Sequence, residues 1–179
     1  DAAGQSLREH LLWQLEMEHF SPREAVVGEA LVDYVNDDGY LTETPESLLA
    51  MLPADAGFTL PEVEAVLARV QALDPAGVAA RDLRECILLQ LAQLDAATPG
   101  LELARAIAAS HLDLVAEHEL AMLRRKLGAS DADIETALAL VRACNPRPGA
   151  GIQAAKPEYV VPDVFVRKHD GKWVVEVNR

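Results

Sequence analysis

The chain has few aromatic residues, few cysteines and no long apolar run. Only 4% of its 179 residues are Phe, Trp or Tyr. No apolar stretch approaches the roughly 18–20 residues of a membrane-spanning helix, so we expect no membrane partner. Cys86 and Cys144 lie in apolar helical patterns, which favours reduced core thiols over a disulfide. Neither an initiating Met nor a signal peptide is present, so we expect a fragment of a longer protein.

Positive charge is scarce in the first part of the chain. Residues 1–78 carry 15 acidic and 3 basic side chains, a net charge of −12. Residues 79–179 carry 14 acidic and 13 basic side chains, a net charge of −1. Nucleic-acid binding draws most of its affinity from cationic contacts with phosphates. Neither part therefore has the charge balance of a DNA-binding domain.

The abundant residues are apolar helix formers. Half of the chain is hydrophobic by composition, mostly Ala, Leu and Val, which predicts a mainly α protein. Four helices are expected to begin after Ser6, Ser21, Thr44 and Thr59, which have the side chains of helix N-caps. In the second helix, Val26, Val27, Ala30, Leu31 and Tyr34 form the predicted buried side, and "NDDGYL" ends the helix with Gly39 at a positive φ. In the fourth helix the predicted buried stripe is Val63, Val66, Leu67, Val70 and Leu73. Later helices are predicted over residues 79–94, 101–109, 111–127 and 131–144, the last with Ser130 as its N-cap.

The spacing of apolar residues changes near the C-terminus from a helical period of 3.6 to the period of 2 that is typical of strands. "NPRPG" (145–149) has two prolines and a glycine, which end any helix. Beyond it, "VPDVFVRKHDGKWVVEV" alternates as two strands around Asp170-Gly171, a favoured two-residue turn. We therefore predict two packed helical subdomains, the second helix-turn-helix-like, followed by a β-hairpin. The predicted boundaries are an acidic subdomain at 1–78, the central helix and second subdomain at 79–149, and an extended segment with the hairpin at 150–179.

No grouping of residues predicts catalysis, a cofactor or a metal. "YVNDDGYLTETP" resembles a calcium loop, but Tyr34 and Pro45 stand where carboxylates are needed. His111 and His118 are seven residues apart, too far to share one metal without other ligands. We predict that the chain is not an enzyme and needs no cofactor.

Residues 117–144 have the outline of a helix-turn-helix. A recognition helix presents hydrogen-bond donors at its N-terminal end, whereas this one presents Asp131, Asp133 and Glu135. A packing or protein-docking unit is therefore preferred over DNA reading. Arg124, Arg125 and Lys126 suit the C-terminal end of the preceding helix electrostatically.

The helix expected at 79–94 carries a glutamine beside its apolar stripe. Leu83, Ile87, Leu91 and Leu94 share one face at 100° per residue, with Cys86 and Gln90 on the edge of that face. Leu88 and Leu89 point elsewhere, so this helix should be buried on more than one side. A buried glutamine must find hydrogen bonds or cost roughly 1–3 kcal/mol. The simpler alternative is a glutamine that reaches solvent at the helix edge.

Three stretches in sequence order resemble one family: "LDPAGVAARDLRECILLQL" (73–91), "CNPRPG" (144–149), and "YVVPDVFV" leading to "GKWVVEVN". They resemble the core-binding region of sigma-54, the activator-dependent sigma factor of bacterial RNA polymerase. The resemblance implies two helical subdomains, binding to core polymerase including its β flap, and a location in the bacterial cytoplasm. It also implies that promoter DNA and the activator ATPase are met through regions absent from this chain.

Several residues follow as candidates under this resemblance. Gln90 would bond main-chain groups across a seam between the subdomains, and Leu88 or Leu89 would face the other subdomain. The predicted seam comprises Leu83, Cys86, Ile87, Leu88, Leu89, Gln90 and Leu91. The motif residues with an architectural role would be Asp74, Pro75, Gly77, Asn145, Pro146, Pro148 and Gly149. The candidate polymerase-docking residues are Arg81, Arg84, Arg124, Arg125, Lys126, Glu24, Glu29 and Asp33.

Two other functions stay open from the residues alone. One is a generic helical adaptor that binds another protein. The other, less favoured, is a DNA-binding module that uses residues 117–144.

Overall fold

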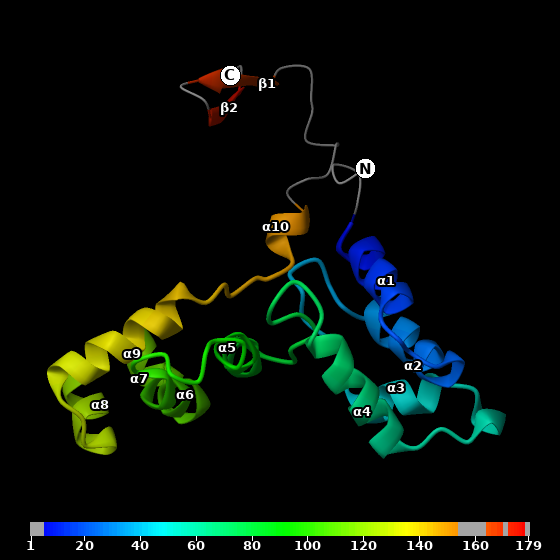
Figure 1. The fold of residues 1–179 in the computed structure, drawn as a ribbon, viewed down its shortest axis with the longest axis horizontal. Helices are drawn as coiled ribbons and strands as arrows, with labels where there is room; N and C mark the ends of the chain where they lie inside the picture. Colours follow the sequence, from blue (N-terminus) through cyan, green and yellow to red (C-terminus); the bar gives the residue numbers. More distant parts are fainter. Residues whose placement is uncertain (1–5, 154–163, 170–171, 178–179) are drawn as a thin grey trace.

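The computed structural model describes residues 6–153, 164–169 and 172–177 (Figure 1). This part of the chain is mainly helical, as the composition predicts. Its helices are α1 (Leu7–Met17), α2 (Pro22–Asp33), α3 (Pro45–Met51), the 3-10 turn η2 (Ala54–Ala56), α4 (Leu60–Gln71), α5 (Leu83–Leu91), α6 (Leu101–Ser110), α7 (Leu112–Ala116), α8 (Leu120–Leu127), α9 (Asp131–Ala143) and α10 (Ala150–Gln153).

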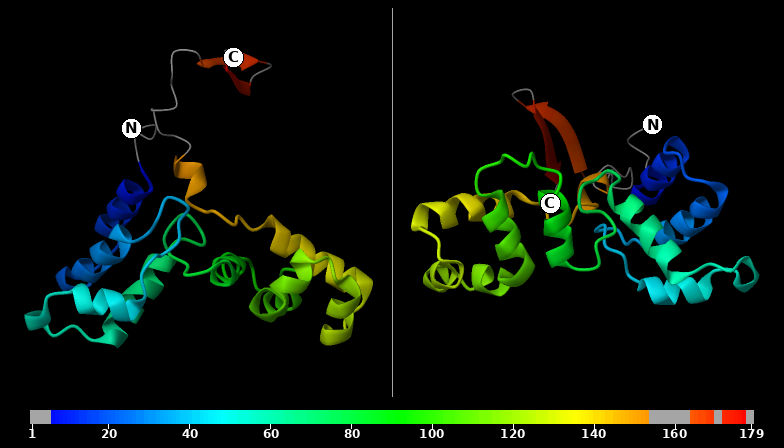
Figure 2. Two further views of the ribbon diagram at one scale, coloured as in Figure 1. Left: turned by 180° about the vertical axis from the view of Figure 1, so that it is seen from behind. Right: turned by 60° about the horizontal axis from the view of Figure 1, so that its bottom comes forward.

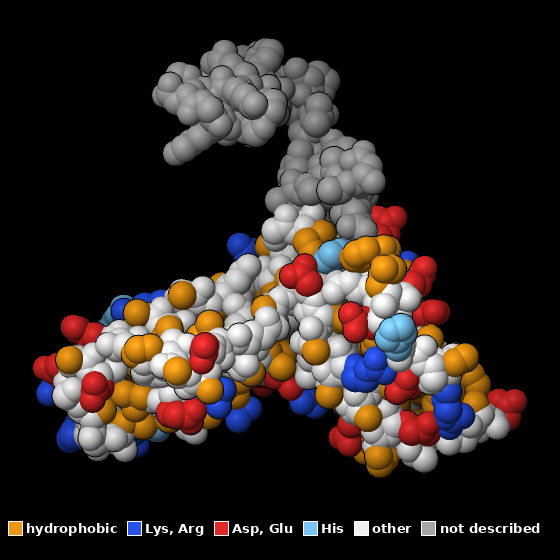
Figure 3. Space-filling model, viewed as in Figure 1, with side chains coloured by type: hydrophobic (Ala, Val, Ile, Leu, Met, Phe, Trp, Pro, Cys, Tyr) orange, Lys and Arg blue, Asp and Glu red, His pale blue; other side chains and the backbone are white. Residues whose placement is uncertain are grey.

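The helices form two groups. Helices α1–α4 lie on one side of the molecule and α5–α9 on the other, with α10 near the junction (Figure 2). The same two groups appear as lobes in the space-filling view (Figure 3).

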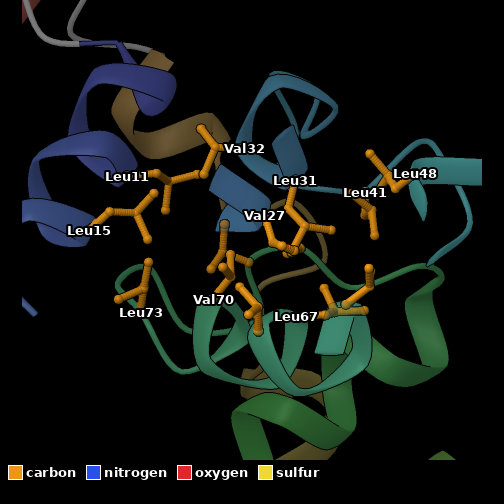
Figure 4. Close-up of a cluster of buried hydrophobic side chains, with 14 of the residues drawn as sticks. Leu11, Leu15, Val27, Leu31, Val32, Leu41, Leu48, Leu67, Val70 and Leu73 are labelled. Atoms are coloured by element: carbon orange, nitrogen blue, oxygen red, sulfur yellow. The ribbon is translucent and has the colours of Figure 1, made fainter. Parts of the chain in front are cut away.

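Each group of helices has its own buried core. The N-terminal core is built from the apolar stripes of α1–α4, whose leucines and valines point toward one another (Figure 4). The stripe predicted for the fourth helix is buried in full: Val63, Val66, Leu67 and Val70 lie in α4, and Leu73 lies two residues beyond its end. The C-terminal core takes its side chains from α5–α9: Ile87, Leu91, Leu101, Ala104, Ile107, Ala108, Leu114, Leu123, Ile134, Ala137, Leu138 and Val141.

Side-chain caps explain where several helices begin. Ser6, Ser21 and Thr59 each accept a hydrogen bond from the amide three residues on, where a Glu bonds back to the cap amide. These capping boxes satisfy amide groups that the first helical turn leaves unpaired. The side chains of Thr44 and Ser130 also accept a hydrogen bond from the amide three residues on, and so cap α3 and α9. All five predicted caps are confirmed.

The end of α2 differs from the prediction. The helix stops at Asp33, and Gly39, at a φ of 100°, belongs to the following turn instead. An isolated bridge between Val35 and Leu41 closes that turn. Val26 was wrongly predicted to be buried: it is 44% exposed, because α1 and α4 cover the side of α2 that carries Val27 and Leu31.

The central helix is shorter than predicted. The Asp82 side chain accepts a hydrogen bond from the Glu85 amide, which starts the helix at Leu83 rather than near Ala79. Ala79 has a φ of 64°, outside the range of a right-handed helix. Residues 79–82 therefore form a connection and not a helical turn, with Ala79 and Ala80 buried and Arg81 and Asp82 exposed.

The single helix predicted over residues 111–127 is also wrong. The chain forms α7 and α8 there, separated at 117–119 by His118 with a φ of 59°. The Glu119 amide bonds the Leu114 carbonyl across this break. Leu114 and Leu123 can then both enter the C-terminal core, which one straight helix would not allow.

The segment after "NPRPG" begins with the short helix α10, where an extended chain was predicted. Ile152 of α10 packs against the N-terminal core. Two strands follow, β1 (Val164–His169) and β2 (Lys172–Val177), which pair antiparallel with Val166 opposite Val175. The predicted turn at 170–171 and the side-chain faces of the ribbon lie outside the described residues, so the hairpin stays a prediction.

Candidate functional site

Three segments from distant parts of the chain meet between the two cores. We call this region the seam; it comprises residues 36–41, 72–82 and 144–149, together with Cys86 and Gln90 of α5. The Ala79 amide donates to the Gly39 carbonyl at 2.7 Å, and the Leu41 amide donates to the Ala80 carbonyl at 2.9 Å. Val78, Ala79 and Ala80 are fully buried. The connection between the lobes is thus held by main-chain pairing with the turn that follows α2.

Gln90 bonds both main-chain polar groups of one residue in the seam. Its amide nitrogen donates to the Asn145 carbonyl at 2.7 Å, and the Asn145 amide donates to the Gln90 side-chain oxygen at 2.8 Å. Gln90 thus bonds main-chain groups, as predicted, but Asn145 follows α9 of the same lobe as α5, so a bond from Gln90 across the lobes stays a prediction. Gly77, at a φ of 92°, makes room for this arrangement, since a Cβ there would lie 2.8 Å from the Gln90 amide nitrogen.

Gln14 makes the same pattern of bonds at the other end of the seam. Its side chain accepts from the Asp74 amide and donates to the Asp74 carbonyl. His10 adds a contact of 2.9 Å from its Nε2 to an Asp74 carboxylate oxygen. Asp74 and Asn145 each precede a proline, which restricts them to extended backbone and leaves their polar groups outside any helix. The sequence offered no signal for Gln14, because its partner lies 60 residues away.

Tyr40 connects the turn after α2 to residues 144–149, which we call the returning segment. Its hydroxyl donates to the Pro146 carbonyl at 2.6 Å. Burial, with a contact to the Cys86 thiol, raises the pKa of Tyr40 to about 12. The phenol is therefore neutral and remains a donor at any physiological pH.

Both cysteines belong to the seam and are free thiols. The Cys86 sulfur lies 3.6 Å from the Asn145 carbonyl oxygen. Burial raises the pKa of both the Cys86 and Cys144 thiols, which keeps them protonated and weakly nucleophilic. Cys86 is buried and Cys144 is half-buried, and their reduced state stays a prediction.

Gly149 and Gly39 allow the returning segment to approach the N-terminal core closely. The Gly149 amide donates to the Asp38 carbonyl at 2.9 Å. A Cβ on Gly149 would lie 2.5 Å from the Asp37 carbonyl oxygen and 2.8 Å from Leu7. Pro148 is buried beside them, whereas Asn145 and Pro146 are exposed.

The leucines of α5 depart from the predicted arrangement. Ile87 and Leu91 are buried in the C-terminal core, but Leu83 is 44% and Leu94 is 39% exposed. Leu83 is the first residue of α5, and Leu94 lies three residues beyond its last residue, Leu91. Helices α6 and α9 therefore cover only the middle of the stripe. Leu88 packs against the C-terminal core, which leaves Leu89 as the residue of the predicted pair that could face the other lobe. Leu89 is half-buried and belongs to neither core.

The basic candidate residues lie on α5, on α8 and, for Arg81, just before α5, and some of them bond neighbouring groups. Arg81 pairs with Glu85 at 2.7 Å, and Arg84 donates to the Ala109 carbonyl. Arg124 pairs with Asp131 at 2.7 Å. Arg125 and Lys126 are exposed at the end of α8, with no ion pair among the described residues.

The acidic candidate residues all lie on α2. Glu24 caps α2 and pairs with Arg69, and Asp33 pairs with Arg8 at 2.9 Å. Glu29 is exposed and makes no ion pair in the described part of the chain. The basic and acidic candidates thus lie in different lobes and do not form one surface.

The helix-turn-helix outline corresponds to α8 and α9, joined by Gly128 at a φ of 62°. Asp131, Asp133 and Glu135 are exposed at the start of α9, as expected from their positions. Acidic groups there repel phosphates rather than bind them.

The described residues contain no group of three or more metal-ligating side chains. Among the same residues, no helix is both long and apolar enough to cross a membrane.

Comparison with known proteins bears directly on this arrangement. Residues 1–179 match the family described as sigma-54 factor, core binding domain. The chain belongs to this family. This sigma-54 core-binding domain is 45% identical over 178 residues to the RNA polymerase sigma-54 factor of Azotobacter vinelandii, covering 99% of the chain. It is 47% identical over 174 residues to that of Salmonella typhimurium and 46% identical to that of Escherichia coli, covering 97% of the chain in both cases. It spans 36% of the length of each relative.

The family motifs coincide with the seam. "LDPAGVAARD" supplies the buried connection and the cap of α5, while "CNPRPG" supplies the returning segment that Gln90, Tyr40 and the Asp38 carbonyl hold. In this core-binding domain the main chain of both motif segments therefore bonds the turn that follows α2.

Proposed function

We propose that this chain docks a sigma-54-type transcription initiation factor on core RNA polymerase, including the β flap, in a non-catalytic role in the bacterial cytoplasm. The observation that carries the proposal is the match of the whole chain to the sigma-54 core-binding domain family. Relatives at 45–47% identity are named RNA polymerase sigma-54 factors, which supports the same partner for this chain.

The seam fits a docking role because it fixes two lobes relative to each other. A rigid pair of lobes presents two surfaces at once without an ordering cost on binding. We propose the division 1–78, 79–149 and 150–179 on this basis, with the last part forming a β-hairpin that leads to a downstream region. Gln90 would act as the polar contact that sets the docking geometry of the lobes.

We further propose that the chain does not itself read the promoter. A net charge of −13 disfavours association with phosphates, and the start of α9 is acidic. Promoter DNA and the activator ATPase would be engaged by the parts of the longer factor that lie outside this chain.

Among the candidate docking residues, Arg125, Lys126 and Glu29 are the best placed. Each is exposed, whereas Arg81, Arg84 and Arg124 already bond neighbouring groups. Rim charges of this kind chiefly control association rate and salt dependence.

Competition with an intact sigma-54 factor for core RNA polymerase tests the proposal. The chain should displace a labelled intact factor, more effectively at low salt, and should bind promoter and random duplex DNA equally weakly. Absence of competition at low salt would reject polymerase docking. Sequence-selective duplex binding would favour the DNA-binding alternative.

A further inference from the structure

A groove between α1 and α2 is not explained by the packing of the N-terminal core. It encloses about 420 Å³ and is lined by Arg8, Leu12, Leu15, Glu16, Glu18, Phe20, Ala25 and Glu29. We call it the α1–α2 groove. It lies on the opposite side of α1 from Gln14 and His10, which bond Asp74 in the seam.

The groove has an apolar floor and an acidic rim. Leu15 is 6% exposed, and Leu12, Phe20 and Ala25 are half-buried, so apolar surface is reachable from outside. Glu16, Glu18 and Glu29 are exposed along the edges, and none makes an ion pair in the described part of the chain. The one rim cation, Arg8, is neutralised by Asp33 at 2.9 Å.

We propose that the α1–α2 groove binds a basic amphipathic helix of core RNA polymerase. A groove between two helices receives the apolar face of a third helix through side chains spaced three and four residues apart. Lys or Arg beside that apolar face would meet the three rim carboxylates. Acidic side chains stand along the α1–α2 side of the molecule, which would attract such a helix from a distance (Figure 3). This inference rests on the proposed polymerase-binding function.

The first test reverses rim charge and measures binding of the 179-residue chain to core RNA polymerase. The groove variant is Glu16→Lys with Glu29→Lys. Its matched control is Asp55→Lys with Glu64→Lys, two exposed acidic residues in the same lobe that neither line the groove nor form an ion pair. The groove variant should bind about tenfold more weakly with a smaller salt dependence, whereas the control should stay within about twofold of the parent.

A second test does not need polymerase. The probe is a peptide of Leu and Lys with Leu at positions i, i+3, i+4 and i+7, compared with a scrambled peptide of the same composition. Amide shifts in the NMR spectrum should concentrate at Leu12, Leu15, Phe20 and Ala25, and should vanish in Glu18→Gln with Glu29→Gln. This milder variant also replaces the first one if charge reversal prevents folding.

The outcomes separate this inference from the proposed function. Polymerase binding that is equal in the groove variant and the control overturns the groove but leaves polymerase docking standing. A parent chain that fails to bind polymerase rejects the docking function, and the peptide test then decides the groove alone. Shifts spread evenly over the acidic lobe, equal shifts with the scrambled peptide, or self-association through the groove would each overturn the inference.

Discussion

In the seam, single side chains make the hydrogen bonds to the main chain that secondary structure makes elsewhere. Gln14 and Gln90 each bond the amide and the carbonyl of a residue that precedes a proline. Proline cannot donate a hydrogen bond, and the preceding residue is kept extended, so neither peptide can join a helix. A side-chain amide carries both N–H donors and a carbonyl acceptor and can therefore satisfy both groups at once.

Removing the Gln90 amide should destabilise the fold. Gln90→Ala leaves the Asn145 amide without its side-chain partner and the Asn145 carbonyl with only the weak Cys86 thiol contact. We expect the free energy of unfolding to fall by roughly 1–3 kcal/mol. Urea denaturation measures it. Gln93→Ala is the control, because Gln93 is exposed two residues after α5 and its side chain bonds no group among the described residues. Equal stability of the two variants would contradict a structural role for Gln90.

Glu62 makes stability depend on pH in the acid range. Hydrogen bonds from Arg23 lower the pKa of Glu62 from 4.5 to about 2. A carboxyl whose pKa is lower in the folded state contributes stability above its unfolded pKa, and that contribution is lost as pH falls from about 5 towards 2. Glu62→Gln keeps the capping side chain but removes the charge, so the stability of this variant should fall less over that range. Chemical denaturation at several pH values, with Glu64→Gln as control, checks this.

At the scale of elements, local backbone conformation decides where helices break. The pattern of apolar residues over 111–127 fits one helix, yet α7 and α8 are separated by His118 in the left-handed region. The break turns Leu114 and Leu123 toward the same core. Burying both leucines outweighs the unfavourable φ of one exposed residue.

Replacing His118 should reveal that backbone strain. Glycine adopts a positive φ without steric cost, so His118→Gly should raise the free energy of unfolding by about 0.5–1 kcal/mol. His118→Val should lower it, because a β-branched side chain is disfavoured there. Glu117→Gly is the control, since Glu117 has a φ of −92° and gains nothing from glycine. Denaturant midpoints that rank glycine below histidine would contradict this account.

At the scale of the whole molecule, the lobes are held together by main-chain contacts rather than by helix packing. α5 packs on α6 and α9 of its own lobe, while segments 72–82 and 144–149 bond the turn after α2. Polar main-chain contacts specify one geometry, because each donor must meet its own acceptor.

A single methyl group in the seam should therefore disturb the docking of the lobes. In Gly149→Ala the new Cβ would meet the Asp37 carbonyl oxygen at 2.5 Å, which forces the segments apart. We expect a loss of about 1–3 kcal/mol and faster hydrogen exchange at the amides of Gly149 and Ala79. Gly151→Ala is a matched control, because nothing lies within 4 Å of a Cβ there. Unchanged exchange in Gly149→Ala would show that the lobes do not depend on this contact.

The sequence by itself determined the features that depend on neighbours within about four residues. Ser6, Ser21, Thr44, Thr59 and Ser130 start their helices because the cap and the amide it accepts from are three residues apart. The buried stripe of α4 was also readable from periodicity, and the need of Gln90 for hydrogen-bond partners was readable from a polar group beside apolar ones. Only the tertiary structure decided which residues 55 to 106 positions apart would meet, as Gln90 does with Asn145 and Tyr40 with Pro146. It also left Leu83 and Leu94 exposed, because burial depends on how far the neighbouring helices extend, and no local pattern contains that length.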